Sequence, residues 1–454
     1  MKLQKEILAI LEKISGIVWG LPLLILLVGT GIYLTFRIGF LQLRLLPYSL
    51  KLAFSFKQDK RSEGDISHFQ ALMTALAATV GTGNIVGVAT AIFLGGPGAV
   101  FWMWVSAFFG MASKYAEAVL AVKYRVQDET GEMSGGPMYY LERGLKQKWL
   151  GVLFAVFGAI AAFGIGNLVQ SNAVSTVVKS TFNVSPWITG VLLTVFSALV
   201  LIGGIKSIGK VTAFFVPIMA LFYIIAGGII LIMNFDLVPA AVSLIFTDAF
   251  TGQAVAGGAI GAVIRYGVAR GVFSNEAGMG SAPIAAAAAK TDLPGRQALV
   301  SMTQVFIDTL VICSITGITI VMAGMYGGDI PAGELTTSSF SHFLGPIGST
   351  VVALGLLFFA SSTIIGWSYY GEKCFTYLFS KKVAIYYRAV FVIAVFIGAI
   401  VNLNVVWAFA DIMNGLMAFP NLVGLLGLSG VVVHETKVIL AKIKEEKEEL
   451  KQSA

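Results

Sequence analysis

Two clusters of polar residues lie among glycines near the middle of long apolar stretches of the sequence. The first is VGTGNIVG at 80–87, and the second is GVFSNEAGMGS at 271–281. A helix that breaks at such a position frees backbone N–H groups on one side and carbonyl groups on the other. The positive end of a half-helix attracts a carboxylate, and free carbonyls coordinate a cation. The clusters therefore indicate a site for a small zwitterion and a cation.

Close helix packing is the simpler interpretation of glycine clusters, because glycine lets backbones approach one another. Here, however, the glycines accompany Thr82, Asn84, Ser274, Asn275 and Glu276 at matching depth. Packing alone does not require a glutamate, and an ionisable residue inside a membrane is a functional candidate by default. The small walls that glycines leave also favour a small substrate.

The overall composition predicts that these clusters lie inside a membrane. Of the 454 residues, 57% are hydrophobic and 12% are charged, whereas soluble domains carry roughly a quarter charged residues. This excludes a soluble multidomain protein, a disordered chain, a collagen and a secreted disulfide scaffold. Cys313 and Cys374 lie in or beside apolar runs and indicate no disulfide or metal framework. We predict an all-α polytopic membrane protein.

A membrane-spanning helix needs about 20 mainly apolar residues, and the sequence contains eleven such stretches. The first lacks a small-residue cleavage site, so we expect a retained helix and not a signal peptide. The stretch at 252–290 is too long for one uninterrupted span and is predicted to be one broken helix. The predicted transmembrane helices are 16–36, 69–94, 97–121, 150–178, 186–204, 211–233, 252–290, 297–323, 346–371, 384–401 and 405–433.

Lys and Arg residues concentrate in alternate loops, and basic loops remain cytoplasmic. The loops at 37–68 and 122–149 are rich in them, whereas 234–251 and 324–345 contain none. This alternation predicts a multi-pass protein of the cell membrane with its N-terminus outside and its C-terminus in the cytoplasm. The net charge of +7 thus mostly reflects the membrane topology. The Lys and Arg residues are scattered among several loops, which argues against a nucleic-acid partner.

The spans also divide into two similar sets. Ten remain after the first, and each set of five opens with one of the glycine-rich breaks. The first set starts on the cytoplasmic side and the second outside, which indicates an inverted repeat. The four expected regions are an extra transmembrane helix with a cytoplasmic loop at 1–68, a first repeat at 69–233, an inverted second repeat at 252–433 and a charged cytoplasmic tail at 434–454.

Three blocks of the sequence resemble the alanine or glycine:cation symporter family. They are GGPGAVFWMWVSAFFG at 95–110, FSNEAGMGSAPIAAAAA at 273–289 and GTGN at 81–84. The resemblance implies a LeuT-like five-plus-five inverted repeat preceded by one extra helix. It also implies sodium-coupled import of small neutral amino acids, with alanine, glycine and serine as the candidates. Sodium would be the coupling ion, and no cofactor is implied.

The resemblance nominates substrate-binding residues at both breaks. In similar transporters the first break meets the substrate carboxylate, and the second supplies backbone and small side chains to the amino group and the pocket wall. Interhelical hydrogen bonding is the alternative role for Gln170, and a lipid-facing position is the alternative for Trp367. The nominated residues are Thr79, Thr82, Gly83, Asn84, Gln170, Phe273, Ser274, Glu276, Gly278 and Trp367.

The resemblance also implies a sodium site between the first broken helix and the eighth core helix. The backbone carbonyls of Ala77 and Val80 would be ligands, together with the hydroxyls of Ser361, Ser362 and Thr363. Oxygen ligands suit a hard cation. Hydroxyl groups in helices also bond to carbonyls of the preceding turn, which is the alternative interpretation of this Ser-Ser-Thr run.

Three acidic residues leave the coupling mechanism open. Glu276 would either act in substrate binding or gating, or pair with Arg265 or Arg270. Asp308 lies mid-span and is either a proton or sodium ligand or a structural residue, whereas Asp411 is expected to be structural. A proton-coupled amino-acid symporter is therefore the main alternative to a sodium symporter.

Two other classes of protein fit the sequence poorly. An ion channel would be expected to show pore-lining rings, and an enzyme a Ser-His-Asp or zinc constellation. The three histidines, His68, His342 and His434, all lie at span ends. The expected partners are a small neutral amino acid, a sodium ion and the lipid bilayer, with no obligate protein partner indicated.

Overall fold

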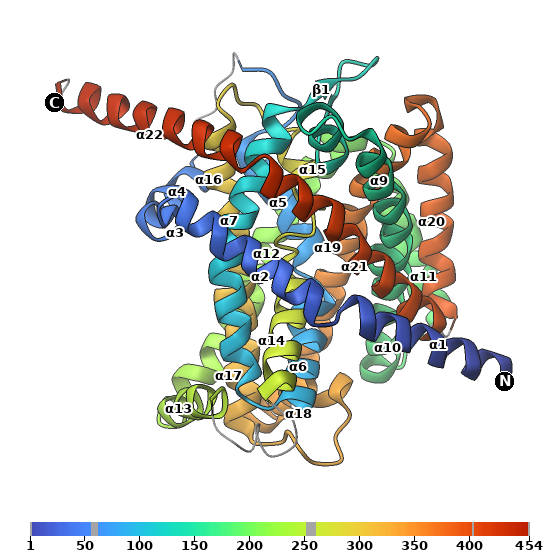
Figure 1. Cartoon of the computed structure of the whole chain (residues 1–454). Coiled ribbons are helices and arrows are strands. Elements are labelled where there is room, and N and C mark those ends of the chain that lie inside the picture. The colour runs from blue at the N-terminus through green and yellow to red at the C-terminus, as the bar shows by residue number, and fades with distance from the viewer. Residues whose placement is uncertain (1, 56–61, 251–259, 402–403, 453–454) are drawn as a thin grey trace.

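The computed structural model describes residues 2–55, 62–250, 260–401 and 404–452. This part of the chain is almost entirely helical, with one short antiparallel hairpin formed by β1 and β2. Long helices lie side by side and run from one end of the molecule to the other (Figure 1). The predicted all-α architecture is therefore confirmed.

The helices and strands follow one another in two groups, where η marks short π-helical or 3-10 turns. The first group is α1 (Lys2–Val18), α2 (Leu21–Arg37), α3 (Leu41–Arg44), α4 (Leu46–Ala53), α5 (His68–Thr79), η1 (Gly83–Gly87), α6 (Val88–Gly95), α7 (Ala99–Lys123), β1 (Val126–Gln127), β2 (Met133–Ser134), α8 (Pro137–Tyr139), η2 (Tyr140–Gly144), α9 (Lys148–Phe163), η3 (Gly164–Leu168), α10 (Val169–Phe182), α11 (Pro186–Leu201), α12 (Gly204–Met233) and α13 (Val238–Asp248). The second group is α14 (Ile260–Asn275), α15 (Pro283–Ala286), α16 (Pro294–Val305), η4 (Phe306–Cys313), α17 (Ser314–Ala323), α18 (Ala332–Leu344), α19 (Pro346–Leu378), η5 (Lys381–Val383), α20 (Ala384–Ile400), α21 (Asn404–Gly427) and α22 (Ser429–Gln452).

Within the described residues, eight helical segments are long and apolar enough to cross a membrane. The bent pair His68–Thr79 and Gly83–Gly95 would make a ninth. The helix Pro186–Leu201 is apolar but shorter, and the predicted span at 252–290 lies partly outside the described residues. The protein therefore crosses the membrane several times, while the count of eleven stays a prediction.

Two predicted boundaries shift in the structure. The last span ends at Gly427 and not at 433, because α22 starts a new direction at Ser429. The predicted charged tail at 434–454 belongs to this helix α22, and one face of the helix is buried at Val432, Ile439 and Ile443. The charged pattern of the tail therefore describes only its outer face.

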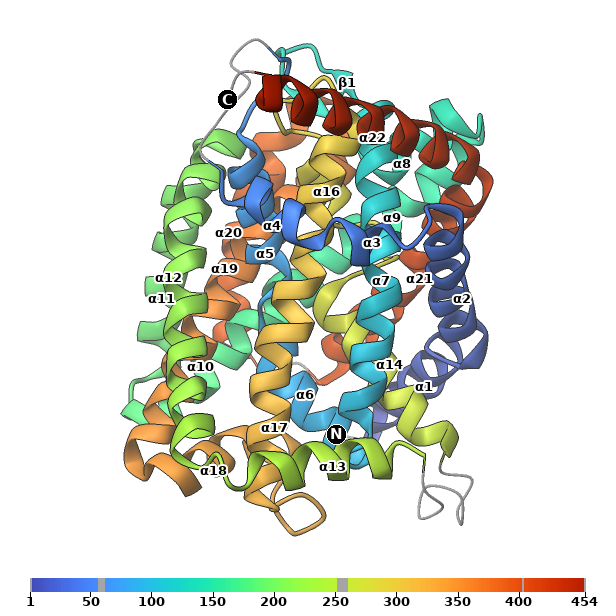
Figure 2. The same ribbon diagram turned by 90° about the vertical axis from the view of Figure 1, so that its left-hand side faces the viewer.

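Different elements lie across the two ends of the bundle (Figure 2). The helix α22 and the β1–β2 hairpin lie at one end, whereas α13 and α18 lie across the other. The first and last helices of the chain lie toward opposite ends of the bundle.

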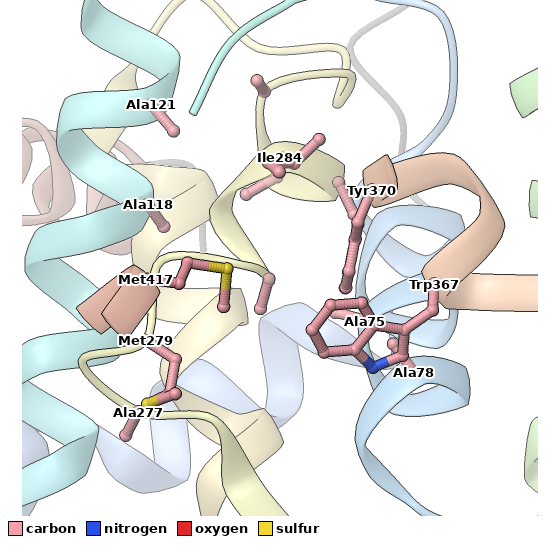
Figure 3. Packing of buried hydrophobic residues seen from close by; sticks show 14 of the residues in the cluster. Ala75, Ala78, Ala118, Ala121, Ala277, Met279, Ile284, Trp367, Tyr370 and Met417 are labelled. Atoms are coloured by element: carbon pink, nitrogen blue, oxygen red, sulfur yellow. The ribbon is translucent and has the colours of Figure 1, made fainter. Parts of the chain in front are cut away.

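Small residues let α19 approach α5 closely. A side-chain carbon added at Gly366 of α19 would lie 2.7 Å from the backbone nitrogen of Ala78 in α5. Figure 3 shows the Trp367 ring beside Ala75 and Ala78 of α5, with Tyr370 next to it. Close approach of small residues stabilises helix pairs in membranes, and it brings α19 against the point where α5 ends.

Candidate functional site

The first helix break lies between α5 and η1. A capping box of Ser67 and Gln70 starts α5, and the following helix is bent from it by 53°. At the break, the Gly81 N–H donates to Oδ1 of Asn84 at 2.9 Å. A Cβ at Gly81 would lie 2.5 Å from Oγ1 of Thr363, so glycine is required for this contact with α19.

The break frees a carbonyl that the sequence nominated as a cation ligand. In a continuous helix the Ala77 carbonyl would accept from the N–H of Gly81, four residues later. That N–H is donated to Asn84 instead. The Ala77 carbonyl accepts a hydrogen bond from Oγ of Ser362 in α19, at 3.2 Å.

The second nominated carbonyl, that of Val80, accepts from Oγ1 of Thr363 at 3.4 Å. The hydroxyls of Ser362 and Thr363 also bond to the Phe359 carbonyl, at 2.8 and 2.9 Å. The intrahelical bonding expected as the alternative is thus present, but each hydroxyl oxygen keeps its lone pairs. The arrangement brings two carbonyls and two hydroxyls together. Ser361 is buried, and no hydrogen bond joins it to α5 in the described structure.

Asp308 forms a second polar cluster next to the first break. One carboxylate oxygen accepts from Nδ2 of Asn84 at 2.8 Å. The other accepts from the hydroxyls of Ser274 at 2.9 Å and Thr309 at 2.8 Å, and Asn275 donates to Thr309 at 3.0 Å. This carboxylate therefore joins the first break, the end of α14 and η4. Sequence analysis left its role open.

A cavity of about 870 Å³ reaches the two breaks, and Thr82 and Phe273 contribute to its lining. The breaks touch there, because a Cβ at Gly83 would lie 3.0 Å from the Cα of Ser274. Gln170 donates to Oγ1 of Thr82 at 3.3 Å, and its own Oε1 has no partner among the described residues. The structure thus brings five of the nominated residues together.

The same cavity also has charged walls. They come from Glu12 of α1, Arg265 and Arg270 of α14, and Asp411 of α21. Asp411 accepts a hydrogen bond from Oγ of Ser15 at 2.6 Å, which fastens α1 to α21. The N-terminal helix therefore forms part of the wall above the breaks.

Thr79 occupies a different place from the other nominated residues of the first break. Its hydroxyl accepts from Nε2 of Gln304 at 3.1 Å and donates to the Ala75 carbonyl at 3.1 Å. It does not line the cavity of the described structure. Its contacts are those of a residue that packs α5 against α16.

The second break begins where α14 ends at Asn275. The backbone φ angles of Glu276, Gly278 and Gly280 are +55°, +83° and +86°. Positive φ is unfavourable for a residue other than glycine, so Glu276 must be held by its contacts. A Cβ at Gly278 would lie 2.9 Å from Leu27 of α2. Gly278 therefore has to be small because of α2. Contrary to our expectation, it does not line the cavity of the described structure.

The carboxylate of Glu276 is bound by neutral donors. It accepts from Nε1 of Trp367 at 2.9 Å and from Oγ of Ser281 at 2.5 Å. The described structure contains no ion pair between Glu276 and Arg265 or Arg270, so the predicted pairing is wrong. Both arginines line the cavity instead. Trp367 is buried, which also rules out a lipid-facing position.

Sequence analysis missed two charged residues of α7 that hold the second break. Nζ of Lys114 donates to the Glu276 carbonyl at 3.0 Å and lies 4.0 Å from Oε2 of Glu117. Oε1 of Glu117 accepts from the Gly280 N–H at 2.9 Å and from Asn421 at 2.7 Å. The available signal was a lysine and a glutamate three residues apart within an apolar span.

The geometry so far is that of two broken helices with a cavity and a group of neutral oxygens between them. The sequence profile of the sodium:alanine symporter family matches residues 4–453, almost the whole chain. The chain belongs to this family. The resemblance inferred from the three sequence blocks is confirmed.

The relatives that match this chain bear the names of transporters and not of enzymes. The sodium/alanine symporter AgcS of Methanococcus maripaludis is 60% identical over 440 residues, which cover 95% of this chain and 97% of that protein. The probable sodium/glutamine symporter GlnT of Bacillus subtilis is 41% identical over 429 residues, covering 93% and 89%.

The fold of this symporter family member is also found in a solved structure. The crystal structure of MhsT in complex with L-phenylalanine aligns with a TM-score of 0.58, covering 83% of this chain and 99% of that one. At 13% identity the similarity concerns the fold alone. It shows that the chain has the LeuT fold implied by the family resemblance, while the five-plus-five arrangement stays a prediction.

Proposed function

We propose that the protein imports small neutral amino acids, with alanine as the first candidate and glycine and serine next, in symport with sodium. The observation that supports this most is the meeting of four neutral oxygens. The carbonyls of Ala77 and Val80 face the hydroxyls of Ser362 and Thr363. Oxygen ligands of this kind suit a hard cation, and a bound ion would join the broken helix to α19. Sodium is here a transported substrate and not a resident cofactor.

The amino acid would bind where the two breaks touch. Its carboxylate would meet the N–H groups that open the half-helix at Gly83, with the Thr82 hydroxyl and Gln170 beside it. Its amino group would meet backbone carbonyls at Phe273 and Ser274. The close approach of Gly83 to Ser274 leaves room for a small side chain only.

The other nominated residues would act around this site. The Asn84 side chain is already hydrogen-bonded to Gly81 and Asp308. Its role in this proposal is to hold the shape of the break. The hydrogen bond between Glu276 and Trp367 would close the path below the substrate. Alternating access would then open that bond as the broken helices rock against α19.

We further propose the topology on which this mechanism rests. It comprises eleven spans, a five-plus-five inverted repeat after the extra helix, an external N-terminus and a cytoplasmic C-terminus in the cell membrane. The LeuT fold and the opposite positions of the first and last helices support it (Figure 2). Cysteine labelling of single-cysteine variants from either side of the membrane would test the orientation.

The test of function is uptake of labelled alanine into proteoliposomes. We expect an inward sodium gradient to drive accumulation and a pH gradient alone not to do so. Ser362→Ala should weaken the apparent sodium affinity about tenfold, because one oxygen ligand worth roughly 1.4 kcal/mol is lost. Ser361→Ala is the matched control and should leave sodium affinity unchanged. Uptake that is indifferent to sodium would disprove the coupling.

Proton coupling and channel activity are the alternatives that the same preparation distinguishes. Asp308 accepts hydrogen bonds from Asn84, Ser274 and Thr309, which satisfy a carboxylate without a proton and favour sodium. Uptake driven by pH and abolished by Asp308→Asn would reverse this conclusion, and single-channel currents would indicate a channel. Competition by alanine, glycine, serine and glutamine at a fixed sodium gradient would define the substrate, since one relative bears the name of a glutamine symporter.

A further inference from the structure

A second cavity, of about 680 Å³, adjoins the charged cavity described above and shares Arg265 and Tyr266 with it. It is a groove between α2, α7 and α14, and most of its lining residues are apolar. Leu24 and Val28 line it from α2, Val105 from α7 and Val268 from α14. Its apolar walls suit a hydrocarbon chain, which the surrounding bilayer supplies.

A cationic side chain lies in the lining of this apolar groove. The guanidinium of Arg265 donates to the Gly16 carbonyl at 3.3 Å and lies over the Tyr266 ring at 5.8 Å. In the described structure no carboxylate lies within 4.0 Å of it. An arginine without an anion is costly in a membrane, so its position indicates an anionic partner at the groove.

We propose that this groove binds an anionic phospholipid. One acyl chain of the lipid would lie along α2 and α14, and the phosphate of the lipid would bind the Arg265 guanidinium. The planar guanidinium binds phosphate oxygens through two parallel hydrogen bonds. Trp102 and Tyr266 also line the groove, and aromatic residues of this kind favour the headgroup level of a bilayer. The acyl chain would fill the space between the extra helix and the half-helix that leads into the second break.

One glycine allows the groove to be filled without disturbing the protein, and a second glycine provides the control. A Cβ at Gly29, which lines the groove, would meet no atom within 4 Å. Phenylalanine at this position would therefore occupy the space of the acyl chain. Gly228 of α12 is equally open but does not line the groove, so Gly228→Phe is the matched control. Arg270 lines the charged cavity and not the groove, which makes Arg270→Gln the control for Arg265→Gln.

The experiment is native mass spectrometry of the purified full-length protein with phosphatidylglycerol or phosphatidylcholine. We expect one phosphatidylglycerol to be retained about tenfold more strongly than phosphatidylcholine, as befits a single charge-assisted contact. Arg265→Gln should remove this preference, and Gly29→Phe should reduce retention of both lipids. Arg270→Gln and Gly228→Phe should behave as the unsubstituted protein does.

Equal retention of the two lipids, or unchanged retention by Gly29→Phe, would overturn the proposal. A loss of phosphatidylglycerol in Arg270→Gln alone would place the phosphate in the charged cavity and would also overturn it. Thermal unfolding of each variant shows whether it is folded. If Arg265→Gln does not fold, the pair Gly29→Phe and Gly228→Phe decides the question.

Discussion

The two helix breaks of this member of the symporter family are held by different kinds of contact. At the first, neutral hydroxyls of α19 meet the carbonyls of Ala77 and Val80 at 3.2 and 3.4 Å. At the second, Lys114 and Glu117 of α7 bind the backbone around Glu276 at 3.0 and 2.9 Å. The contacts of the first break with α19 are thus long and uncharged, whereas the contacts of the second break with α7 are short and come from buried charges.

This difference indicates which break exchanges its partners. Hydroxyl hydrogen bonds of 3.2 Å and more are longer than the usual 2.7–2.8 Å or so, and a cation can replace them easily. Separating buried charges from their partners is costly. We therefore expect the first break to respond to sodium and the second to keep one local structure. The unfolding temperature of detergent-purified protein and of variants at either break, measured with and without sodium, tests both expectations.

The largest effect should come from Lys114→Met. The substitution leaves Glu117 buried without its cation and removes the donor to the Glu276 carbonyl. Breaking a buried ion pair in this way costs about 3–5 kcal/mol, so the unfolding temperature should fall strongly. Sodium should still stabilise the variant by the same increment as the unsubstituted protein, because the proposed sodium ligands are intact.

The control for this prediction is Lys148→Met. Lys148 is largely exposed and lies 3.7 Å from Glu142, so its loss should change stability by less than about 1 kcal/mol. If Lys114→Met abolished the response to sodium but left stability unchanged, the second break and not the first would be the one that responds to sodium.

Trp367→Phe should have the second largest effect. It keeps an aromatic ring against α5 but removes the hydrogen bond to Glu276. A hydrogen bond to a charged group is worth about 1.5–3 kcal/mol, and Ser281 still binds the other oxygen. Tyr370→Phe, which removes a buried hydroxyl without a hydrogen-bond partner in the described structure, is the control. Equal costs for the two variants would show that Glu276 is not held by Trp367.

The contrast between the breaks also explains what could be predicted from the sequence. Both breaks, the LeuT fold and the meeting of Ala77 and Val80 with Ser362 and Thr363 followed from glycine spacing and family blocks. Backbone ligands depend on where a helix ends, and glycines mark that position in the sequence. The placement of Phe273 and Thr82 near each other followed in the same way.

Side-chain partners across helices were harder to predict. One of the two roles considered for Glu276 was pairing with Arg265 or Arg270, which are close in sequence, but the break turns it toward Trp367 on α19. Gly278 was assigned to the pocket wall, yet its size is set by Leu27 of the extra helix. Such contacts depend on the relative rotation of distant helices, which one sequence does not contain.

Gly81→Ala should separate stability from sodium binding at the first break. The added methyl would lie 2.5 Å from Oγ1 of Thr363, and overpacking of this kind costs about 1–3 kcal/mol. It also pushes Thr363 away from the Val80 carbonyl, so sodium should no longer stabilise the variant. In the unsubstituted protein, sodium at 100 times its dissociation constant should stabilise the fold by about 2.7 kcal/mol. Gly87→Ala, with its nearest contact at 4.0 Å, is the control. A sodium response retained by Gly81→Ala would move the ion away from this break.

The smallest effect should come from Glu132→Gln in the β1–β2 hairpin, where charges lie near the surface. Burial raises the pKa of Glu132, but the hydrogen bond from Lys381 and the charge of Lys373 outweigh it and hold the pKa below its usual value. The carboxylate therefore stabilises the fold above its unfolded pKa of about 4.3, and this contribution is lost as the pH falls through the lower folded value. At pH 7 the substitution should cost about 0–1 kcal/mol, and at pH 3 less, as thermal unfolding at both pH values would show. A cost as large as that of Lys114→Met would mean that charge itself, and not its burial beside the backbone, distinguishes the second break from the first.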